Sequence, residues 1–225
     1  MSVDTELVAT IREVLRAEAD PARAAQMQAY MKSAMPYLGV GVPVVRRLTR
    51  RAAEGRPGEL DDLRDTAAVL WREAVFREER YAATGLTGLR QAIGRLELLD
   101  LHREMVVTGA WWDHVDEVSH RVGDVLRAHR QAVTPVIRSW ARDPDLWLRR
   151  TAVLCQLGDK GATDLGLLSE VIEANAGDRE FFVRKAIGWA LRDYARTDPG
   201  WVLAYVEAHP SLSPLSRREA LKHLR

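Results

Sequence analysis

The sequence has little of what usually identifies an enzyme or its compartment. Its 225 residues include one cysteine, Cys155, so no internal disulfide can form, and such usage is typical of a reducing cytoplasm. No apolar run approaches the roughly 20 residues that a membrane span requires. The first residues also lack the basic and apolar regions of a signal peptide. We therefore expect a cytoplasmic protein with no membrane partner.

Familiar catalytic and ligand-binding motifs are missing as well. The chain has no glycine-rich phosphate loop, no paired-cysteine or His-x-x-x-His metal spacing, and no Gly-x-Ser-x-Gly elbow. We accordingly predict no metal and no cofactor. Cys155 lies on an apolar helix face and is predicted in the core. His114 and His120 are predicted on the surface.

A net charge of +1 does not by itself predict a polyanionic partner. The basic residues nevertheless gather in short clusters, away from acidic stretches such as 59–65, which allows a one-sided basic surface. These clusters are Arg46–Arg47 with Arg50–Arg51, Arg149–Arg150, Arg184–Lys185, and Arg217–Arg218 with Lys222.

What the sequence has in abundance is helical periodicity. Apolar residues make up 47% and charged residues 29%, as in an ordinary globular protein, and no segment alternates as a strand would. Asp20-Pro21 and Asp198-Pro199 each place a capping residue before a first-turn proline, and 55–58 is a predicted turn. We predict helices at roughly 4–18, 21–34, 43–56, 60–72, 76–86, 89–97, 98–107, 111–129, 131–141, 145–157, 163–174, 178–196, 199–208 and 214–224.

Two of these segments share a rhythm. In 145–154 and in 180–189 an acid precedes a bulky apolar cluster, two basic residues and a small residue, and 73–83 is a looser copy. An offset of about 35 residues is typical of helical repeats, which stack into curved arrays with a concave surface. The sequence therefore predicts an all-α, curved solenoid of antiparallel helical repeats. Because no linker divides it, we expect one domain over 1–225.

The stretch 108–116 contains two adjacent tryptophans and two acids. Trp111 is in phase with an apolar stripe that begins at Val115, so it is predicted in the core. Trp112 is rotated about 100° away and pairs with Asp116 one turn later. Asp113 stands in the first turn, where the helix dipole favours an acid.

Two further aromatic residues lie off the apolar stripe of their helices. Trp189 is aligned with Lys185 and Arg192, and Tyr30 is close to Lys32. Each aromatic residue could simply be half-buried at a junction between repeats. Aromatic faces beside basic residues are also what stacking on nucleotides requires.

Asp116 has two interpretations of its own. It could be a solvated helix acid, or the partner of an arginine such as Arg150. Placed beside an indole and held by an arginine, its carboxylate would remain ionised and could stabilise a developing cation.

Motifs over nearly the whole chain resemble the AlkD-type DNA alkylation repair proteins, a family of HEAT-like repeat DNA glycosylases. The motifs are Tyr30-Met31-Lys32 with Tyr37-Leu38-Gly39-Val40, Trp111-Trp112-Asp113-His114-Val115-Asp116, Trp147-Leu148-Arg149-Arg150, 185–195 and 214–223.

The resemblance implies hydrolysis of the N-glycosidic bond of cationic N3- or N7-alkylated purines in double-stranded DNA. It implies no flipping of the base into a pocket, and a basic, concave DNA-binding face. It places the catalytic aspartate at Asp116, DNA-facing tryptophans at Trp112 and Trp189, and the supporting arginine at Arg150. We expect DNA contacts from Tyr30, Lys32, Arg149, Lys185, Arg192, Arg217, Arg218 and Lys222.

The chemistry of such a substrate fits the same residues. An alkylated purine is already a cationic leaving group, so one carboxylate that stabilises the sugar cation and positions water suffices. No candidate lysine nucleophile stands beside Asp116, which predicts an abasic product without strand cleavage. We expect a monomer, nucleoid-associated when bound to DNA. The alternatives are a non-catalytic HEAT-repeat protein that binds DNA structures or a protein partner, and a helical scaffold without nucleic acid.

Overall fold

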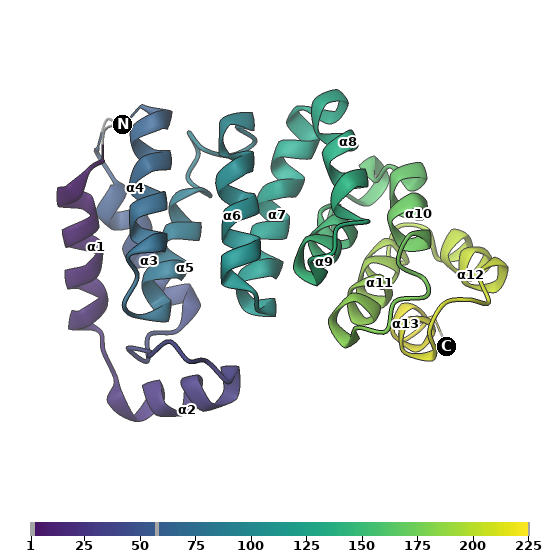
Figure 1. Ribbon diagram of the computed structural model, residues 1–225, viewed down its shortest axis with the longest axis horizontal. Coiled ribbons are helices and arrows are strands. Elements are labelled where there is room, and N and C mark those ends of the chain that lie inside the picture. The colour runs from purple at the N-terminus through teal and green to yellow at the C-terminus, as the bar shows by residue number, and fades with distance from the viewer. Residues whose placement is uncertain (1–2, 57–58, 225) are drawn as a thin grey trace. The chain divides into compact units, whose positions relative to one another are not determined.

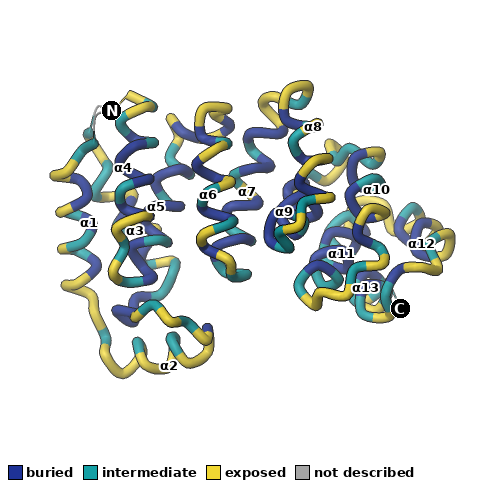
Figure 2. Tube along the Cα trace, viewed as in Figure 1, coloured by how far each residue is buried: buried dark blue, intermediate teal, exposed yellow. Residues whose placement is uncertain are grey.

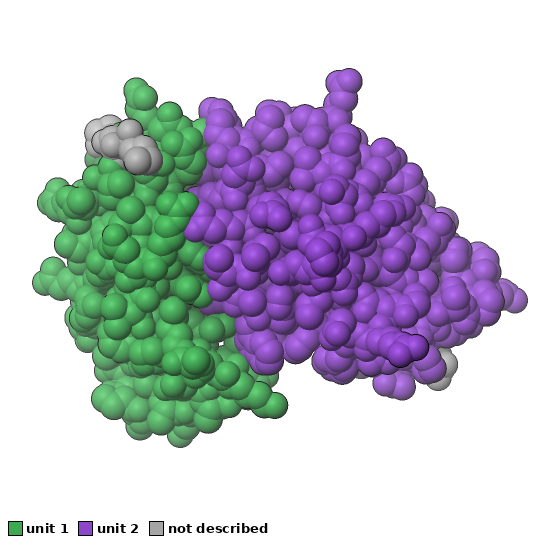
Figure 3. All heavy atoms as spheres, in the orientation of Figure 1, with its two compact units in different colours: residues 1–93 green, residues 94–225 purple. Residues whose placement is uncertain are grey.

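The computed structural model describes residues 3–56 and 59–224. Over these ranges it contains thirteen α-helices, two short 3-10 helices and no strand, which confirms the predicted all-α class (Figure 1). The helices form two compact units, Met1–Ile93 and Gly94–Arg225, coloured separately in Figure 3. A single domain over 1–225 stays a prediction. Of the turn predicted at 55–58, residues 57–58 lie outside the described ranges.

The described residues of unit 1 form five helices, and four of them share a core. Helix α1 packs on α3, α4 and α5, and the side chains of Ile11, Leu15 and Leu70 are fully buried between them. The helices are α1 (Thr5–Ala17), α2 (Pro21–Met31), α3 (Val42–Ala53), α4 (Leu60–Arg72) and α5 (Arg77–Leu86).

Helix α2 differs from the other helices of unit 1. Asp20 caps it by accepting the backbone N–H groups of Ala22 and Arg23, as the Asp20-Pro21 pair predicts. Figure 1 draws α2 across the direction of α1 and α3, and Met31 is its only buried residue among those described (Figure 2). Most residues of α2 are therefore exposed to solvent.

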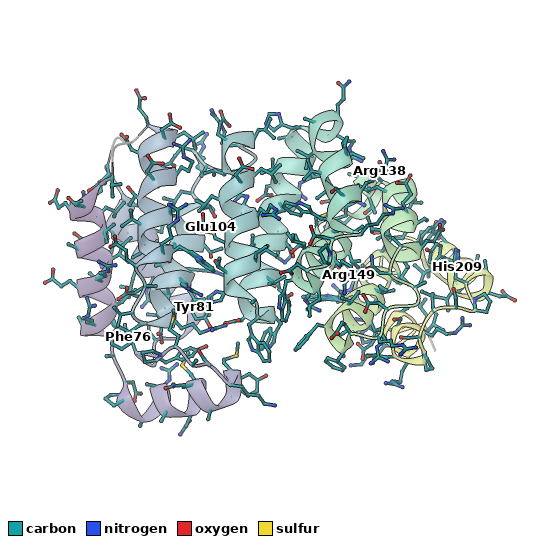
Figure 4. All side chains as sticks on the ribbon, in the orientation of Figure 1. Phe76, Tyr81, Glu104, Arg138, Arg149 and His209 are labelled. Carbon is teal, nitrogen blue, oxygen red and sulfur yellow. The ribbon has the colours of Figure 1, made fainter. Side chains whose placement is uncertain are left out.

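The loop after α2 is fixed by a buried acid. Glu78, at the start of α5, is fully buried, and its carboxylate accepts the backbone N–H groups of Leu38, Gly39 and Val40. The hydroxyls of Tyr37 and Tyr81, the latter labelled in Figure 4, meet at 3.0 Å beneath the same loop. Three charge-assisted hydrogen bonds compensate for the desolvation of the Glu78 carboxylate.

Unit 2 contains the remaining helices, arranged so that α7 and α9 are covered on several sides. Helix α7 packs on α6, α8 and α9, and α11 packs on α9, α12 and α13. The helices are α6 (Leu99–Gly109), α7 (Trp112–Ala128), α8 (Arg130–Trp140), α9 (Leu146–Leu154), α10 (Leu165–Glu173), α11 (Phe181–Tyr194), α12 (Pro199–Ala208) and α13 (Pro214–Ala220), with 3-10 turns at Leu96–Leu98 and Lys160–Ala162.

The predicted repeat is present in unit 2. Asp145 and Glu180 are the N-cap residues of α9 and α11, so the two helices begin 35 residues apart. Trp147 and Phe182 occupy equivalent positions in the two copies, and their rings pack with centroids 5.0 Å apart. The repeat thus buries its bulky residues against the next copy, as stacked repeats do.

Some predicted boundaries are wrong. The helix predicted at 89–97 is absent, because residues 88–94 form turns, and only the 3-10 turn Leu96–Leu98 follows. Gly94 adopts a φ of 72°, a conformation that L side chains rarely take and that interrupts a helix. The last helix ends at Ala220, earlier than the predicted 224. None of the described helices is long and apolar enough to cross a membrane.

Candidate functional site

The candidate site is built around an ion pair between α7 and α9. The Arg150 guanidinium donates from Nε to Asp116 Oδ1 at 2.7 Å and from Nη2 to Oδ2 at 2.9 Å. Its Nη1 donates to the backbone carbonyl of Phe182 on α11. One buried arginine, only 3% exposed, therefore fixes the carboxylate in a bidentate geometry and ties three helices together.

The electrostatics of Asp116 follow from this geometry. Its side chain is 17% exposed, and the loss of water raises the pKa of the Asp116 carboxyl above its ordinary value. The hydrogen bonds and positive charge of Arg150 oppose that shift. The two hydrogen bonds from a guanidinium, which does not deprotonate in proteins, favour the ionised carboxylate. The predicted partnership of Asp116 and Arg150 is therefore present, and part of the carboxylate stays accessible.

An aromatic cluster packs beside this pair. The rings of Trp111, Trp147 and Phe182 lie 5.0–6.1 Å apart, centroid to centroid, and the Arg150 guanidinium stands 5.9 Å from the Phe182 ring. Trp111 packs in this cluster but is only half-buried, so the prediction that it lies in the core is met in part; Val115 on the same stripe is fully buried. The cluster shields the ion pair from water on its inner side.

Phe181 extends the cluster to the surface and was not anticipated. Its ring meets Phe182 edge-on at 5.4 Å, yet the residue is 52% exposed. The sequence carried a signal, because Phe181 is equivalent to Leu146 in the repeat, and two adjacent phenylalanines cannot both occupy one buried stripe.

Trp112 is the first residue of α7 and is half-buried, one helical turn before Asp116. Asp113 lies in the first turn, as expected. The prediction for His114 is wrong: this residue is 1% exposed, because α7 is flanked by α6, α8 and α9 and more than one face is covered. The surface prediction for His120 and the core prediction for Cys155 are confirmed, and burial raises the pKa of the Cys155 thiol to about 12.

Trp189 on α11 stands between two cations that share one acid. Lys185 and Arg192 are four residues before and three residues after it, and both pair with Glu219 of α13. The Lys185 Nζ lies 2.8 Å from Glu219 Oε1, while Arg192 Nη1 donates to Oε2. Sequence reasoning missed Glu219, because it comes from a different helix 27 residues after Arg192.

The other predicted DNA-binding residues of unit 2 divide into two groups. Arg149, labelled in Figure 4, bonds to Asp178 and to the carbonyls of Asp143 and Pro144. Arg217 donates to two carbonyls at the end of α12. Both side chains therefore stabilise turns and helix ends, whereas Arg218 and Lys222 are exposed.

Tyr30 and Lys32 belong to unit 1. Tyr30 is 76% exposed at the end of α2, and Lys32 follows it in a left-handed conformation, with a φ of 51°. On α3, the four arginines noted in the sequence are all exposed. The contacts of Tyr30 and Lys32 with DNA stay predictions.

This arrangement can carry out one kind of chemistry well. A fixed, ionised and partly exposed carboxylate can stabilise a nearby positive charge and orient a water molecule. Aromatic side chains beside it favour a cationic partner. Over residues 3–56 and 59–224, no three His, Cys, Asp or Glu side chains gather into a metal-binding group.

The chain is similar to known proteins over most of its length. Residues 11–224 match the family described as DNA alkylation repair enzyme. A solved structure described as a predicted DNA alkylation repair enzyme from Enterococcus faecalis is 31% identical. It has a TM-score of 0.82, with 92% of this chain and 96% of that one covered. No sequence among the curated proteins matches.

More distant structures share the fold. AlkD2 from Streptococcus mutans is 17% identical with a TM-score of 0.64, covering 89% of this chain and 96% of its own. An alkylpurine DNA glycosylase, AlkC from Pseudomonas fluorescens, was solved bound to DNA containing an abasic site analog. It is 16% identical with a TM-score of 0.52, and 98% of this chain matches 61% of that one.

Proposed function

We propose a specific activity for this chain, which belongs to the DNA alkylation repair enzyme family. It is a monofunctional DNA glycosylase that hydrolyses the N-glycosidic bond of cationic N3- or N7-alkylated purines in duplex DNA and leaves an abasic site. The observation that carries the proposal is the bidentate Asp116–Arg150 pair, an ionised carboxylate fixed at a partly exposed position. The distant likeness to an alkylpurine glycosylase bound to DNA supports the same class of ligand.

The reaction needs little more than this carboxylate. In the alkylated purine, the bond from C1′ to the base nitrogen breaks with its electron pair moving to the base, which neutralises the positive charge. The sugar acquires oxocarbenium character, which the Asp116 carboxylate stabilises. A water molecule oriented by the same carboxylate adds to C1′ and releases its proton to Asp116 or to solvent.

The neighbouring side chains serve binding and selectivity. Trp112, one turn from Asp116, and Trp189 offer indole faces that attract a cationic nucleotide and discriminate against neutral purines. The base need not be flipped into a pocket, because the cation is recognised at the duplex surface. These residues all come from unit 2 of one chain, so the proposed site needs no second subunit, in keeping with the expected monomer.

The product is an abasic site without strand cleavage. A lyase reaction would need an amine to form a Schiff base with the sugar. Helices α7 and α9, which carry Asp116 and Arg150, contain no lysine. Hydrolysis is therefore the reaction that these side chains support.

Replacement of the carboxylate tests the proposal. In Asp116→Asn, release of 7-methylguanine from alkylated duplex should fall by about 10²–10³-fold, because the stabilising charge is lost. Binding to undamaged duplex should stay within about twofold, since phosphate contacts carry it. Single-turnover base release and fluorescence anisotropy measure the two quantities.

Asp113→Asn is the matched control, because it removes the same charge three residues earlier and should leave base release intact. Full activity in Asp116→Asn would overturn the proposal. A wild-type protein that binds duplex DNA but releases no base would instead be the non-catalytic DNA-binding alternative.

A further inference from the structure

Glu219 has an environment that nothing in the proposed reaction explains. Its carboxylate, 12% exposed, accepts from Arg192 and pairs with Lys185, so it holds the two cations that flank Trp189 on α11. A DNA-binding surface ordinarily gains from unpaired cations, and an acid among them lowers its attraction for phosphates. The presence of Glu219 between these cations therefore requires a separate explanation.

The packing fixes Glu219 at this position. A Cβ placed on Gly188 would lie 2.4 Å from Glu219 Cβ and 2.9 Å from the Ser216 carbonyl oxygen, so only a glycine lets α13 approach α11 this closely. The Ser216 hydroxyl donates to the Arg184 carbonyl in the same contact. The carboxylate is thus built into the α11–α13 junction, one residue away from Trp189.

The two cations differ in how tightly they are held. The Lys185 side chain is 39% exposed and Arg192 is 19% exposed. Both positive charges lower the pKa of the Glu219 carboxyl, the hydrogen bond from Lys185 most strongly. Water screens the Lys185 pair more than the Arg192 pair, because the lysine is more exposed, so an incoming anion competes first for Lys185.

We propose that Glu219 acts as an exchangeable counter-ion, which holds Lys185 and Arg192 on either side of Trp189 and releases them to DNA phosphates on binding. The free protein then keeps both long side chains ordered, and its attraction for undamaged DNA is moderated. This proposal rests on the proposed function in one respect, since its ligand is duplex DNA. It makes Glu219 a positioning residue for binding rather than a catalytic one.

The test measures binding of undamaged duplex to Glu219→Gln as a function of salt. Removal of the competing charge should tighten binding about tenfold at about 50 mM salt and steepen the slope of log K against log salt by about 0.9, as one added phosphate contact does. Lys185→Gln should weaken binding more in the Glu219→Gln background than in the wild type, because the lysine is then committed to phosphate alone.

Glu170→Gln is the matched control. It removes the same charge from an ion pair with Arg138 elsewhere in unit 2, and should leave both affinity and salt slope unchanged (Figure 4). Unchanged or weaker binding by Glu219→Gln, with thermal unfolding like that of the wild type, would overturn the proposal. A general charge effect would also overturn it, and would appear as equal gains in Glu170→Gln.

If Glu219→Gln does not fold, a titration of Glu219 in the wild-type protein tests the same proposal. The Glu219 carboxyl, followed by carbon-13 NMR, should titrate below the usual glutamate range in the free protein and move up towards it with undamaged duplex bound. A pKa that does not move on binding contradicts the exchange. These binding readouts do not depend on base release, so loss of the proposed activity alone leaves the exchange intact, whereas absence of any DNA binding overturns both.

Discussion

Two carboxylates in unit 2 meet arginine in opposite ways. Asp116 is clamped by one deeply buried guanidinium through two parallel hydrogen bonds, and burial raises its pKa. Glu219 is shared by Lys185 and Arg192, both partly exposed, and these cations lower its pKa. The first arrangement fixes the carboxylate that the proposed hydrolysis uses. The second holds two cations that DNA phosphates can bind.

This difference shows that an ion pair near an aromatic residue can have different roles at different sites. Each carboxylate joins neighbouring helices and has a tryptophan associated with it: Trp112 is one turn before Asp116, and Trp189 lies between the two cations that Glu219 binds. What separates the two sites is the exposure of the cation, because a buried arginine cannot leave its partner without leaving the acid uncompensated. Exposure therefore distinguishes a fixed charge from an exchangeable one.

The largest effect is expected at Arg150. Arg150→Met leaves Asp116 buried without its partner, which should lower the free energy of unfolding by about 3–5 kcal/mol. Arg138→Met, which breaks an exposed pair with Glu170, should cost about 1 kcal/mol or less. Urea denaturation compares them, and equal losses would contradict the assignment of Arg150 as a fixed partner.

A second comparison concerns the glycines at the two junctions. A Cβ on Gly123 of α7 would lie 2.1 Å from the Cys155 carbonyl oxygen beside α9, and Gly188 plays the same part between α11 and α13. Alanine at either position should cost about 1–3 kcal/mol through overpacking. Gly123→Ala should cost more, because its added Cβ would meet a backbone oxygen at 2.1 Å, whereas the nearest atom to a Cβ on Gly188 is the Glu219 Cβ at 2.4 Å.

Gly177→Ala is the control for both glycine variants, since nothing lies within 4 Å of its added Cβ. Thermal unfolding should rank the three substitutions with Gly123→Ala as the most damaging. A loss in Gly177→Ala as large as in Gly188→Ala would mean that packing is not the cause.

Acidification should separate the two carboxylates. Base release needs ionised Asp116, so activity should fall as pH drops through a pKa raised above the ordinary 3.8. The Glu219 pKa is lowered below the ordinary 4.5, so its cluster contributes stability above that range and loses it only as pH falls through the lowered value. The difference in affinity between the wild type and Glu219→Gln should therefore disappear as pH falls through the Glu219 pKa, because protonation then removes the same charge as the substitution.

Single-turnover rates and anisotropy titrations between about pH 4 and pH 7 follow both quantities. In Arg150→Met the acid limb of the rate profile should move to higher pH, because the opposing positive charge is lost. A profile unaffected by Arg150→Met would break the link between this arginine and Asp116 ionisation.

The smallest effect is expected at Phe181. Phe181→Ala should reduce base release by a few-fold with little change in stability, because the ring is 52% exposed and borders the Asp116 site. Leu203→Ala, an exposed apolar residue on α12, is the matched control. Equal rates for the two variants would remove Phe181 from the site.

The sequence predicted much of the fold and part of the site. Most helices, the stripe from Trp111 to Val125 and the 35-residue repeat were predicted from periodicity, because spacing along a helix is a local property. The pairing of Asp116 with Arg150 could be proposed from the resemblance to the AlkD-type family, which places the supporting arginine at Arg150. The turn at 88–94 could not, because a single glycine inside a helical pattern is ambiguous.

By itself, the sequence determined the all-helical fold, its repeat and the aromatic and acidic residues of α7. Only the tertiary structure decided that His114 is buried, that Arg149 and Arg217 serve carbonyls, and that Lys185 and Arg192 share Glu219. The physical reason is that helix formation depends on neighbours a few residues away. Burial and the choice of ionic partner depend on which distant helices pack together. The side chains at those junctions decide that Asp116 has a buried partner and Glu219 has more exposed ones.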